Sequence, residues 1–192
     1  MKTLEERLQA VEDRLEIYNV ISAWGPSADG NNLEALERIF APDGIWDNRD
    51  YRYVEGIDDI KQILDSQDHR TLTDSGVAHY GNLPHVELDG DRAIATNYSA
   101  VFGRRDGAPM VLRVTVSRYY MSRGPHGWRI DRRVIDPLDG RASARELAGR
   151  VFEGPGEDPG GRTDAYSLPA GEVGAWSETL QSTYRASPQR QD

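Results

Sequence analysis

Apolar side chains near the start of the chain recur at steps of three and four residues, which is the spacing of one helix face. They are Leu8, Val11, Leu15, Tyr18 and Ile21. Thr3 and Glu6 precede this run at the spacing of a capping box. The pattern predicts an amphipathic helix over 3–24 that buries its apolar face and turns charged residues such as Asp13 to solvent.

Two interruptions frame a second, shorter helix. Gly25-Pro26 is expected to stop or kink the first helix, because proline lacks an N–H and clashes with the carbonyl four residues back. The second helix is predicted to begin near Asn31, which can cap it together with Glu34. Its apolar positions end before the turn residues at 41–44.

The next segments predict a strand and a third helix. Residues 45–54 alternate aromatic and polar side chains, as a strand or an irregular hairpin does, and Asp47 is the carboxylate expected to point inward. Residues 57–67 return to helical spacing. Residues 68–76 are predicted to form a loop.

From residue 77 onward the pattern is that of strands. The stretch 77–88 is an apolar run between turn residues and predicts a strand that enters a hairpin. Three further strands are predicted over 92–104, 110–122 and 128–136, joined by short turns. Four consecutive antiparallel strands form a curved meander.

The two faces of the predicted strand 92–104 differ in character. One face carries large side chains such as Tyr98, and the other carries small or polar ones such as Asn97. A small, mixed face suits a pocket or packed helices. In the last strand, Arg133 lies on the face opposite Trp128 if no bulge intervenes.

The C-terminal part of the chain has a different composition. Residues 141–152 predict a short helix, and the Gly- and Pro-rich, acidic remainder from residue 153 predicts a mostly disordered tail. The expected organisation is one domain over 1–140 and a C-terminal extension over 141–192.

Composition narrows the classes of partner. A chain of 192 residues suits one core of ordinary size. Its net charge of -9 argues against a nucleic-acid partner, and its lack of cysteine excludes disulfides and thiolate metal sites. No run approaches the roughly 18 apolar residues that a membrane span needs. We therefore expect a soluble cytoplasmic protein with no membrane partner.

His79, inside the apolar run, is the first candidate for chemistry. An unperturbed imidazole has a pKa near 6.5, which suits a general base at ambient pH. The alternative is a core histidine with a purely structural hydrogen bond. His69, His85 and His126 are predicted to lie in loops or at the surface. The four histidines lack the spacing of a metal site, so we expect neither a metal nor a cofactor.

The order of elements predicts an α+β fold, in which N-terminal helices pack on a strongly curved antiparallel sheet around one cavity, in the shape of a cone. Several segments also carry a family resemblance: 13–17, 28–36, 40–44, 54–57 and 127–130. Through them, residues 1–140 resemble the nuclear transport factor 2-like superfamily, in its SnoaL-like polyketide cyclase and scytalone dehydratase branch. One scaffold hosts enzymes, binding proteins and accessory subunits there.

The resemblance also implies roles for single residues. In members that perform eliminations, a histidine on the strand after the third helix pairs with an aspartate at the end of the first, and His79 and Asp29 match these positions. An arginine shortly after a tryptophan on the last strand assists the leaving group, and Arg133 is similarly placed. The family usually has a tyrosine or lysine five residues before the aspartate. Here that residue is Trp24, whose indole cannot act as an acid.

Further polar and aromatic residues are expected to shape the pocket or to bind substrate: Trp24, Tyr80, Asp47, Tyr51, Tyr53 and Asn97. Structural alternatives stay open for several assignments. Asp29 is also an ordinary turn residue, and one member of the Arg132-Arg133 pair is expected to be a solvated edge charge. Asp47 is also a suitable ion-pair partner for an arginine.

These observations predict a cofactor-independent lyase or isomerase that acts on a small hydrophobic carbonyl compound or alcohol. His79 is the expected base, Asp29 its orienting partner and Arg133 the electrophilic helper. Dehydration is the leading reaction, and cyclisation and double-bond isomerisation are close behind it. The alternative is a non-catalytic ligand-binding or accessory subunit on the same fold. A homodimer is expected in either case.

Overall fold

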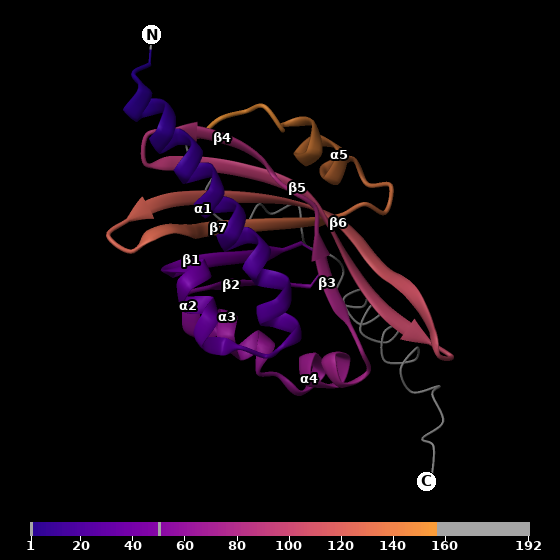
Figure 1. Cartoon of the computed structure of the whole chain (residues 1–192). Helices are drawn as coiled ribbons and strands as arrows, with labels where there is room; N and C mark the ends of the chain where they lie inside the picture. Colours follow the sequence, from indigo (N-terminus) through magenta and orange to yellow (C-terminus); the bar gives the residue numbers. More distant parts are fainter. Residues whose placement is uncertain (1, 50, 157–192) are drawn as a thin grey trace.

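The computed structural model describes residues 2–49 and 51–156. Helices pack against a curved seven-stranded sheet of order β2-β1-β7-β6-β5-β3, and β4 pairs with β5 beside β3 (Figure 1). The predicted α+β class is confirmed. The elements are α1 (Leu4–Asp29), α2 (Leu33–Ile39), β1 (Phe40–Asn48), β2 (Arg52–Glu55), α3 (Ile57–Leu64), α4 (Gln67–Asp74), β3 (Ala78–Gly81), β4 (His85–Asp89), β5 (Arg92–Arg105), β6 (Ala108–Gly124), β7 (Gly127–Pro137) and α5 (Ala142–Gly149).

The first helix begins as predicted and ends later than predicted. Thr3 and Glu6 form the capping box, in which each backbone N–H donates to the other side chain. The helix then continues through Gly25-Pro26 to Asp29, so it does not stop there, and the alternative of a kink stays a prediction. Pro26 lies in the last helical turn, where the helix is also held by a 2.7 Å hydrogen bond from Ser27 Oγ to the Ala23 carbonyl.

Gly25 is needed because α1 meets β3 there at very close range. A Cβ atom at residue 25 would lie 2.1 Å from the carbonyl oxygen of His79, which is well inside van der Waals contact. Only a residue without a side chain permits this approach. Gly25, which suggested a helix end in the sequence, is therefore the residue that allows the end of α1 to contact β3.

The buried face of α1 differs from the predicted one. Leu8, Val11 and Leu15 are 56%, 54% and 55% exposed, whereas Ile17 and Ile21 are buried in the core. With about 3.6 residues per turn, Leu8 and Leu15 lie on the side of α1 opposite to Ile17 and Ile21, which face the sheet. In the single chain this apolar stripe faces solvent, and the pairing of two chains stays a prediction.

Asp13 is buried, although the pattern had placed it on the solvent face. Its Oδ1 accepts hydrogen bonds from Trp128 Nε1 at 3.0 Å and from Arg123 Nη1 at 2.8 Å. A buried carboxylate is stable only when its charge and its lone pairs are satisfied in this way. The polar cluster attaches α1 to the end of the β6–β7 hairpin.

The short helices also differ from prediction in their bounds. Asn32, and not Asn31, caps α2 by accepting from the Ala35 N–H at 3.1 Å, while Asn31 adopts a positive φ of 48°. Helix α3 ends at Leu64, and the predicted loop after it contains α4. Ser66 caps α4 through a 3.3 Å bond from the His69 N–H.

The sheet is mixed, which corrects the prediction of antiparallel pairing throughout. The segments β1 and β2 form the predicted hairpin, but β1 runs parallel to β7. Parallel neighbours need a long connection, and here the whole of β2 to β6 supplies it. The predicted strand 77–88 is divided into β3 and β4, which pair with successive parts of β5.

A β-bulge in β7 decides which way Arg133 faces. Ile130 pairs with Met121 and Arg132 pairs with Tyr120, so Asp131 is an extra residue opposite the β6 strand. The extra residue reverses the alternation of side chains. Arg133 therefore lies on the helix-covered face together with Ile130, whereas regular alternation would have turned it away.

The opposite face of the sheet is covered by α5 (Figure 1). Its buried residues Ala144 and Leu147 pack in the same cluster as Ile94 and Val134. Buried Arg118 donates to the carbonyl oxygens of Arg150 and Glu153, at 2.7 and 2.9 Å, and holds the chain beyond the helix. The predicted tail falls mainly on 157–192, which lie outside the described residues. Among the described residues, no helix is long and apolar enough to cross a membrane.

Replacing Gly25 tests the close contact between α1 and β3. We expect Gly25→Ala to lower the free energy of unfolding by about 1–3 kcal/mol, because the added methyl group forces the helix and the strand apart. Denaturant unfolding followed by circular dichroism measures this. Gly149→Ala is the control, since a Cβ at this helical glycine meets no atom within 4 Å. Equal stability of the two variants would contradict the contact.

Candidate active site

A cavity of about 880 Å³ lies between the helices and the curved sheet. Side chains from α1, α3, α4 and five strands line it, and most of them are apolar or aromatic, as is usual for small-molecule pockets. The small, mixed face of β5, with Asn97, Ser99 and Val101, forms part of the wall. This confirms the predicted direction of that face.

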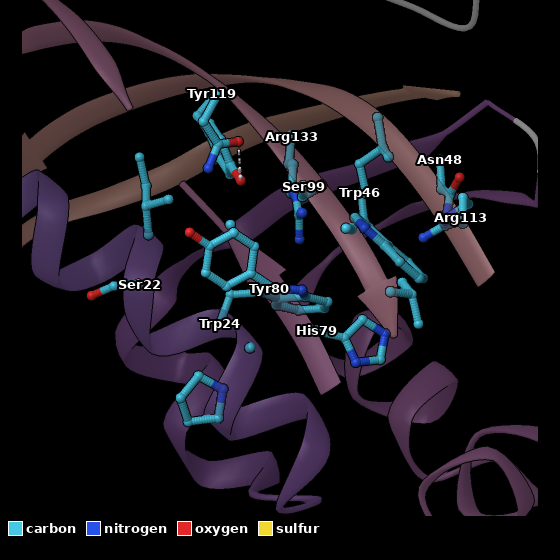
Figure 2. Close-up of a pocket in the computed structure, with 18 of the residues that line it drawn as sticks. Ser22, Trp24, Trp46, Asn48, His79, Tyr80, Ser99, Arg113, Tyr119 and Arg133 are labelled. Atoms are coloured by element: carbon cyan, nitrogen blue, oxygen red, sulfur yellow. Dashed lines mark hydrogen bonds between the residues drawn. The ribbon is translucent and has the colours of Figure 1, made fainter. Parts of the chain in front are cut away.

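His79 and Asp29 meet at the edge of the cavity through two hydrogen bonds. Asp29 Oδ1 lies 2.6 Å from His79 Nδ1, and Asp29 Oδ2 accepts from the His79 backbone N–H at 2.9 Å. An ionised carboxylate accepts and does not donate, so Nδ1 carries the ring proton. The other ring nitrogen, Nε2, has no hydrogen-bond partner among the described residues, and His79 lines the cavity (Figure 2).

The chain places Asp29 where its charge needs compensation. The residue is the last of α1, and the C-terminal end of a helix disfavours a negative charge by about 0.3–1 kcal/mol. The two bonds from His79 supply that compensation. Strand β3 is fixed in turn by its pairing with β5, where His79 lies opposite Val101.

Arg133 is buried against two aromatic rings. Its Cζ lies 4.8 Å from the ring centre of Trp24 and 5.2 Å from that of Tyr119. Nη2 donates to Ser117 Oγ at 3.3 Å. Burial lowers the pKa of the guanidinium from its ordinary value, and Tyr119 opposes that shift. Figure 2 shows Arg133 among Tyr119, Trp46 and Trp24 in the middle of the pocket, with His79 at the lower end of the view.

Several other predicted pocket residues line the cavity. Trp24 packs against Trp46 with ring centres 5.9 Å apart, and Tyr51 and Tyr80 contribute to the wall. Asn97 also lines it, but its amide is already engaged, since Oδ1 accepts from Tyr119 at 3.3 Å and Nδ2 donates to the Asn82 carbonyl at 3.0 Å. The side chain of Asn97 therefore orients its neighbours.

Asp47 and Tyr53 lie outside the cavity wall, which corrects their predicted substrate-binding roles. Trp46 and Asn48 point into the cavity, so Asp47 between them faces away, where it forms a buried 2.8 Å ion pair with Arg132. Tyr53 is the register partner of Asp47 and shares its face. Its hydroxyl donates to Glu55 at 2.7 Å, and burial together with this bond raises the pKa of Tyr53 to about 12.

His69 is a pocket residue that the sequence analysis placed in a loop. It lies on α4 and stacks on His79, with ring centres 6.1 Å apart and an interplanar angle of 28°. Burial, followed by the nearby charge of His79, lowers the pKa of His69 below its usual value. The helix-capping Ser66 three residues earlier is the signal that could have placed this histidine on a helix.

The described residues contain no group of three or more His, Asp or Glu side chains arranged to hold a metal ion. Of the histidines that do not line the cavity, His85 bonds Glu87 at 2.6 Å. His126 lies exposed in the turn between β6 and β7. The cavity therefore brings together the two stacked histidines, Asp29 behind one of them, and Arg133, and its wall also contains Asp68, Arg113 and several tyrosines.

Comparison with known proteins begins with sequence. A family model described as a SnoaL-like domain matches residues 9–134. An uncharacterized protein of Mycobacterium tuberculosis is 32% identical over 136 residues, which cover 65% of this chain and 84% of the relative. The family match spans β1, β3, β5, β6 and most of β7, and it includes both members of the His79 and Asp29 pair.

Solved structures show the same fold. An NTF2-like protein with a cystatin-like fold from Novosphingobium aromaticivorans is 37% identical, with a TM-score of 0.73, over 77% of this chain and 97% of that chain. A protein of the same organism provisionally assigned as a scytalone dehydratase is 14% identical, with a TM-score of 0.58, over 71% of this chain and 89% of that one. At 14% identity the likeness concerns the fold alone.

The lowered pKa of His69 predicts a pH dependence of stability. The usual pKa of histidine is 6.5, and the pKa of His69 in the folded state is lower. Below about pH 6.5 the folded chain therefore binds fewer protons than the unfolded chain does. Stability is therefore lost toward acid pH. We expect His69→Gln to show a smaller loss of unfolding free energy between about pH 7.5 and 5.5 than the unmodified protein, measured by denaturant titration. His126→Gln, in the exposed turn, should retain the original dependence, and an unchanged profile in His69→Gln would contradict the assignment.

Proposed function

Because the chain belongs to the SnoaL-like domain family of the nuclear transport factor 2-like superfamily, we propose that it is a cofactor-independent lyase or isomerase. The substrate is a small hydrophobic carbonyl compound or alcohol that enters the 880 Å³ cavity. Family membership supports an activity of the isomerase, cyclase or dehydratase type. The observation that carries the proposal is the 2.6 Å contact between His79 and Asp29.

The chemical step begins with His79 Nε2. Its lone pair takes a proton from the carbon next to a carbonyl group, the C–H bond breaks, and the electron pair moves onto the carbonyl oxygen as an enolate. Asp29 holds the proton on Nδ1 and stabilises the imidazolium that forms. A carboxylate in this position thereby lowers the barrier to proton removal.

Arg133 supports the developing negative charge. Its guanidinium is held in a water-poor environment by Trp24 and Tyr119, where a charge acts more strongly than it does in water. Nε and Nη1 of Arg133 have no hydrogen-bond partner within the described residues, so one of them can donate to an enolate oxygen. In this role the arginine contacts the substrate, while Ser117 positions it.

The second half of the reaction needs an acid. Trp24 stands where the family usually has a tyrosine or lysine, and its indole N–H does not ionise in the accessible range. Protonated His79 is the acid that remains at the site, because Nε2 carries the proton it has just taken. It can return that proton to a different carbon, to a new alkoxide, or to a departing hydroxyl group, which correspond to isomerisation, cyclisation and dehydration.

The rival function is ligand binding without catalysis. Trp24 favours it, because an aromatic wall in place of an acid suits a site that only holds a hydrophobic molecule. The two functions differ in one measurable respect, which is whether a bound ketone exchanges the hydrogens on its α-carbon with solvent.

We expect the protein to catalyse exchange of α-hydrogens in a panel of small hydrophobic ketones in D2O, followed by NMR. Exchange needs only the base, so it does not depend on knowing the final product. His79→Ala should lower the exchange rate by about 10²-fold or more, the usual contribution of a general base. The control is His85→Ala, which removes a histidine that bonds Glu87 outside the cavity and should leave the rate unchanged. Equal rates in the two variants would sink the proposal.

Asp29→Asn separates orientation from charge. The amide keeps the size of the carboxylate and can still accept a hydrogen bond, but it no longer compensates a positive imidazolium. We expect an exchange rate at least about 10-fold lower at saturating ketone, with little change in the KM, because the charge is needed only after proton transfer begins. A rise in KM at constant kcat would indicate that Asp29 shapes the pocket and does not assist the base.

A further inference from the structure

Arg133 lacks the carboxylate partner that three other buried or half-buried arginines of the described chain have, while buried Arg118 is held by backbone carbonyl groups. Arg132 pairs with Asp47 at 2.8 Å, Arg123 with Asp13 at 2.8 Å, and Arg49 with Asp136 at 2.6 Å. Within the described residues, Arg133 donates to the neutral hydroxyl of Ser117, and Tyr119 is its other hydrogen-bonding neighbour. A buried cation without a neighbouring carboxylate is costly, so the arrangement calls for negative charge from elsewhere.

Unsatisfied donors gather beside this cation. Arg133 is 4% exposed, and its Nε and Nη1 are buried without a hydrogen-bond partner in the described part of the chain. Trp46 Nε1 is also buried without a partner. Trp46 and Arg133 are register partners on the parallel strands β1 and β7, and both side chains line the cavity (Figure 2).

Three orphaned donors from two adjacent strands match a ligand that accepts hydrogen bonds and carries negative charge. We propose that the cavity binds its substrate through a carboxylate group, which is held by Arg133 and Trp46, so that the substrate class is a small hydrophobic carboxylic acid. This inference rests on the proposed function and deepens it by naming the group that anchors the substrate. Asn48 Oδ1, also orphaned and buried, offers one acceptor nearby for a hydroxyl group on the same ligand.

The geometry of the guanidinium favours a planar acceptor. The rings of Trp24 and Tyr119 lie against it at 4.8 and 5.2 Å, which leaves its edge as the route of approach. A carboxylate fits one edge with two parallel hydrogen bonds, one from Nη2 and one from Nε or Nη1, as arginine and carboxylate groups commonly pair. Most of the remaining wall is aromatic and aliphatic, so the rest of the ligand is mainly an apolar body.

The proposal is tested by binding a matched pair of ligands. 2-Naphthoate and 2-naphthamide have the same ring and nearly the same shape, and only the first is charged. Calorimetric titration of the full chain at neutral pH should give a Kd for 2-naphthoate at least about 10-fold lower than for 2-naphthamide, as a charge-assisted bond predicts. Equal affinity, or tighter binding of the amide, would overturn the proposal.

Substitutions then locate the anchor. Arg133→Met fills the same apolar space without the charge and should abolish the preference for the acid while binding of the amide changes less than about 2-fold. Trp46→Phe keeps a ring and removes only the N–H, so it should reduce the preference in part. Arg145→Gln is the control, because this exposed arginine of α5 does not line the cavity and should leave the preference unchanged.

The outcomes separate this inference from the proposed function. If Arg133→Met does not fold, Trp46→Phe decides, and an unchanged preference in Trp46→Phe overturns the site. The same pair of ligands is also measured on His79→Ala, which lacks the base. If the protein prefers the acid, and His79→Ala keeps that preference, but the unmodified protein does not catalyse ketone exchange, the catalytic proposal is rejected and the anchor is kept. If the unmodified protein catalyses ketone exchange but does not prefer the acid, the anchor is rejected and the catalytic proposal is kept.

Discussion

The contact between the end of α1 and the backbone of β3 is the constraint on which the rest of the site depends. Gly25 lets the helix approach until its position is fixed by the His79 carbonyl, and Asp29, one turn later, then reaches both nitrogens that His79 presents to it. One side of the cavity is closed by the same contact. The base, its orienting partner and the wall are therefore set by a single junction of helix and strand.

Charge is distributed unevenly around this junction. The chain carries a net charge of -9, yet the carboxylates near the cavity are engaged elsewhere, Asp29 by His79 and Asp47 by Arg132. Arg133 faces the cavity with aromatic neighbours and no carboxylate beside it. An acidic protein thus presents a basic interior, in which imidazole and guanidinium groups face an apolar space. Such a site selects for molecules that carry or develop negative charge.

The sequence predicted the type of most elements, because periodicity and capping are local properties. It also predicted the match of Asp29 with His79, through resemblance. It did not predict which side of α1 is buried, since apolar residues lie on both sides of the helix and only the packing on the sheet shows that Ile17, and not Leu8, is covered. His69 was missed because α4 is short and polar. Asp47 and Tyr53 were assigned to the pocket because the sequence shows that alternate strand residues face opposite sides but does not show which set faces inward. The structure shows that Trp46 faces inward, so Asp47 next to it faces away.

The bulge at Asp131 has a consequence for how this fold can diverge. Loss of Asp131 would remove the bulge and leave Ile130 and Arg132 as neighbours on opposite faces, which is the arrangement that they already have. Arg133 would therefore keep its place in the cavity. A strand of the same length without the bulge would instead turn Arg133 away and bring Val134 to the cavity side. Within such a family, alignments that match the Arg132-Arg133 pair by letter alone would conceal whether the cation enters the cavity.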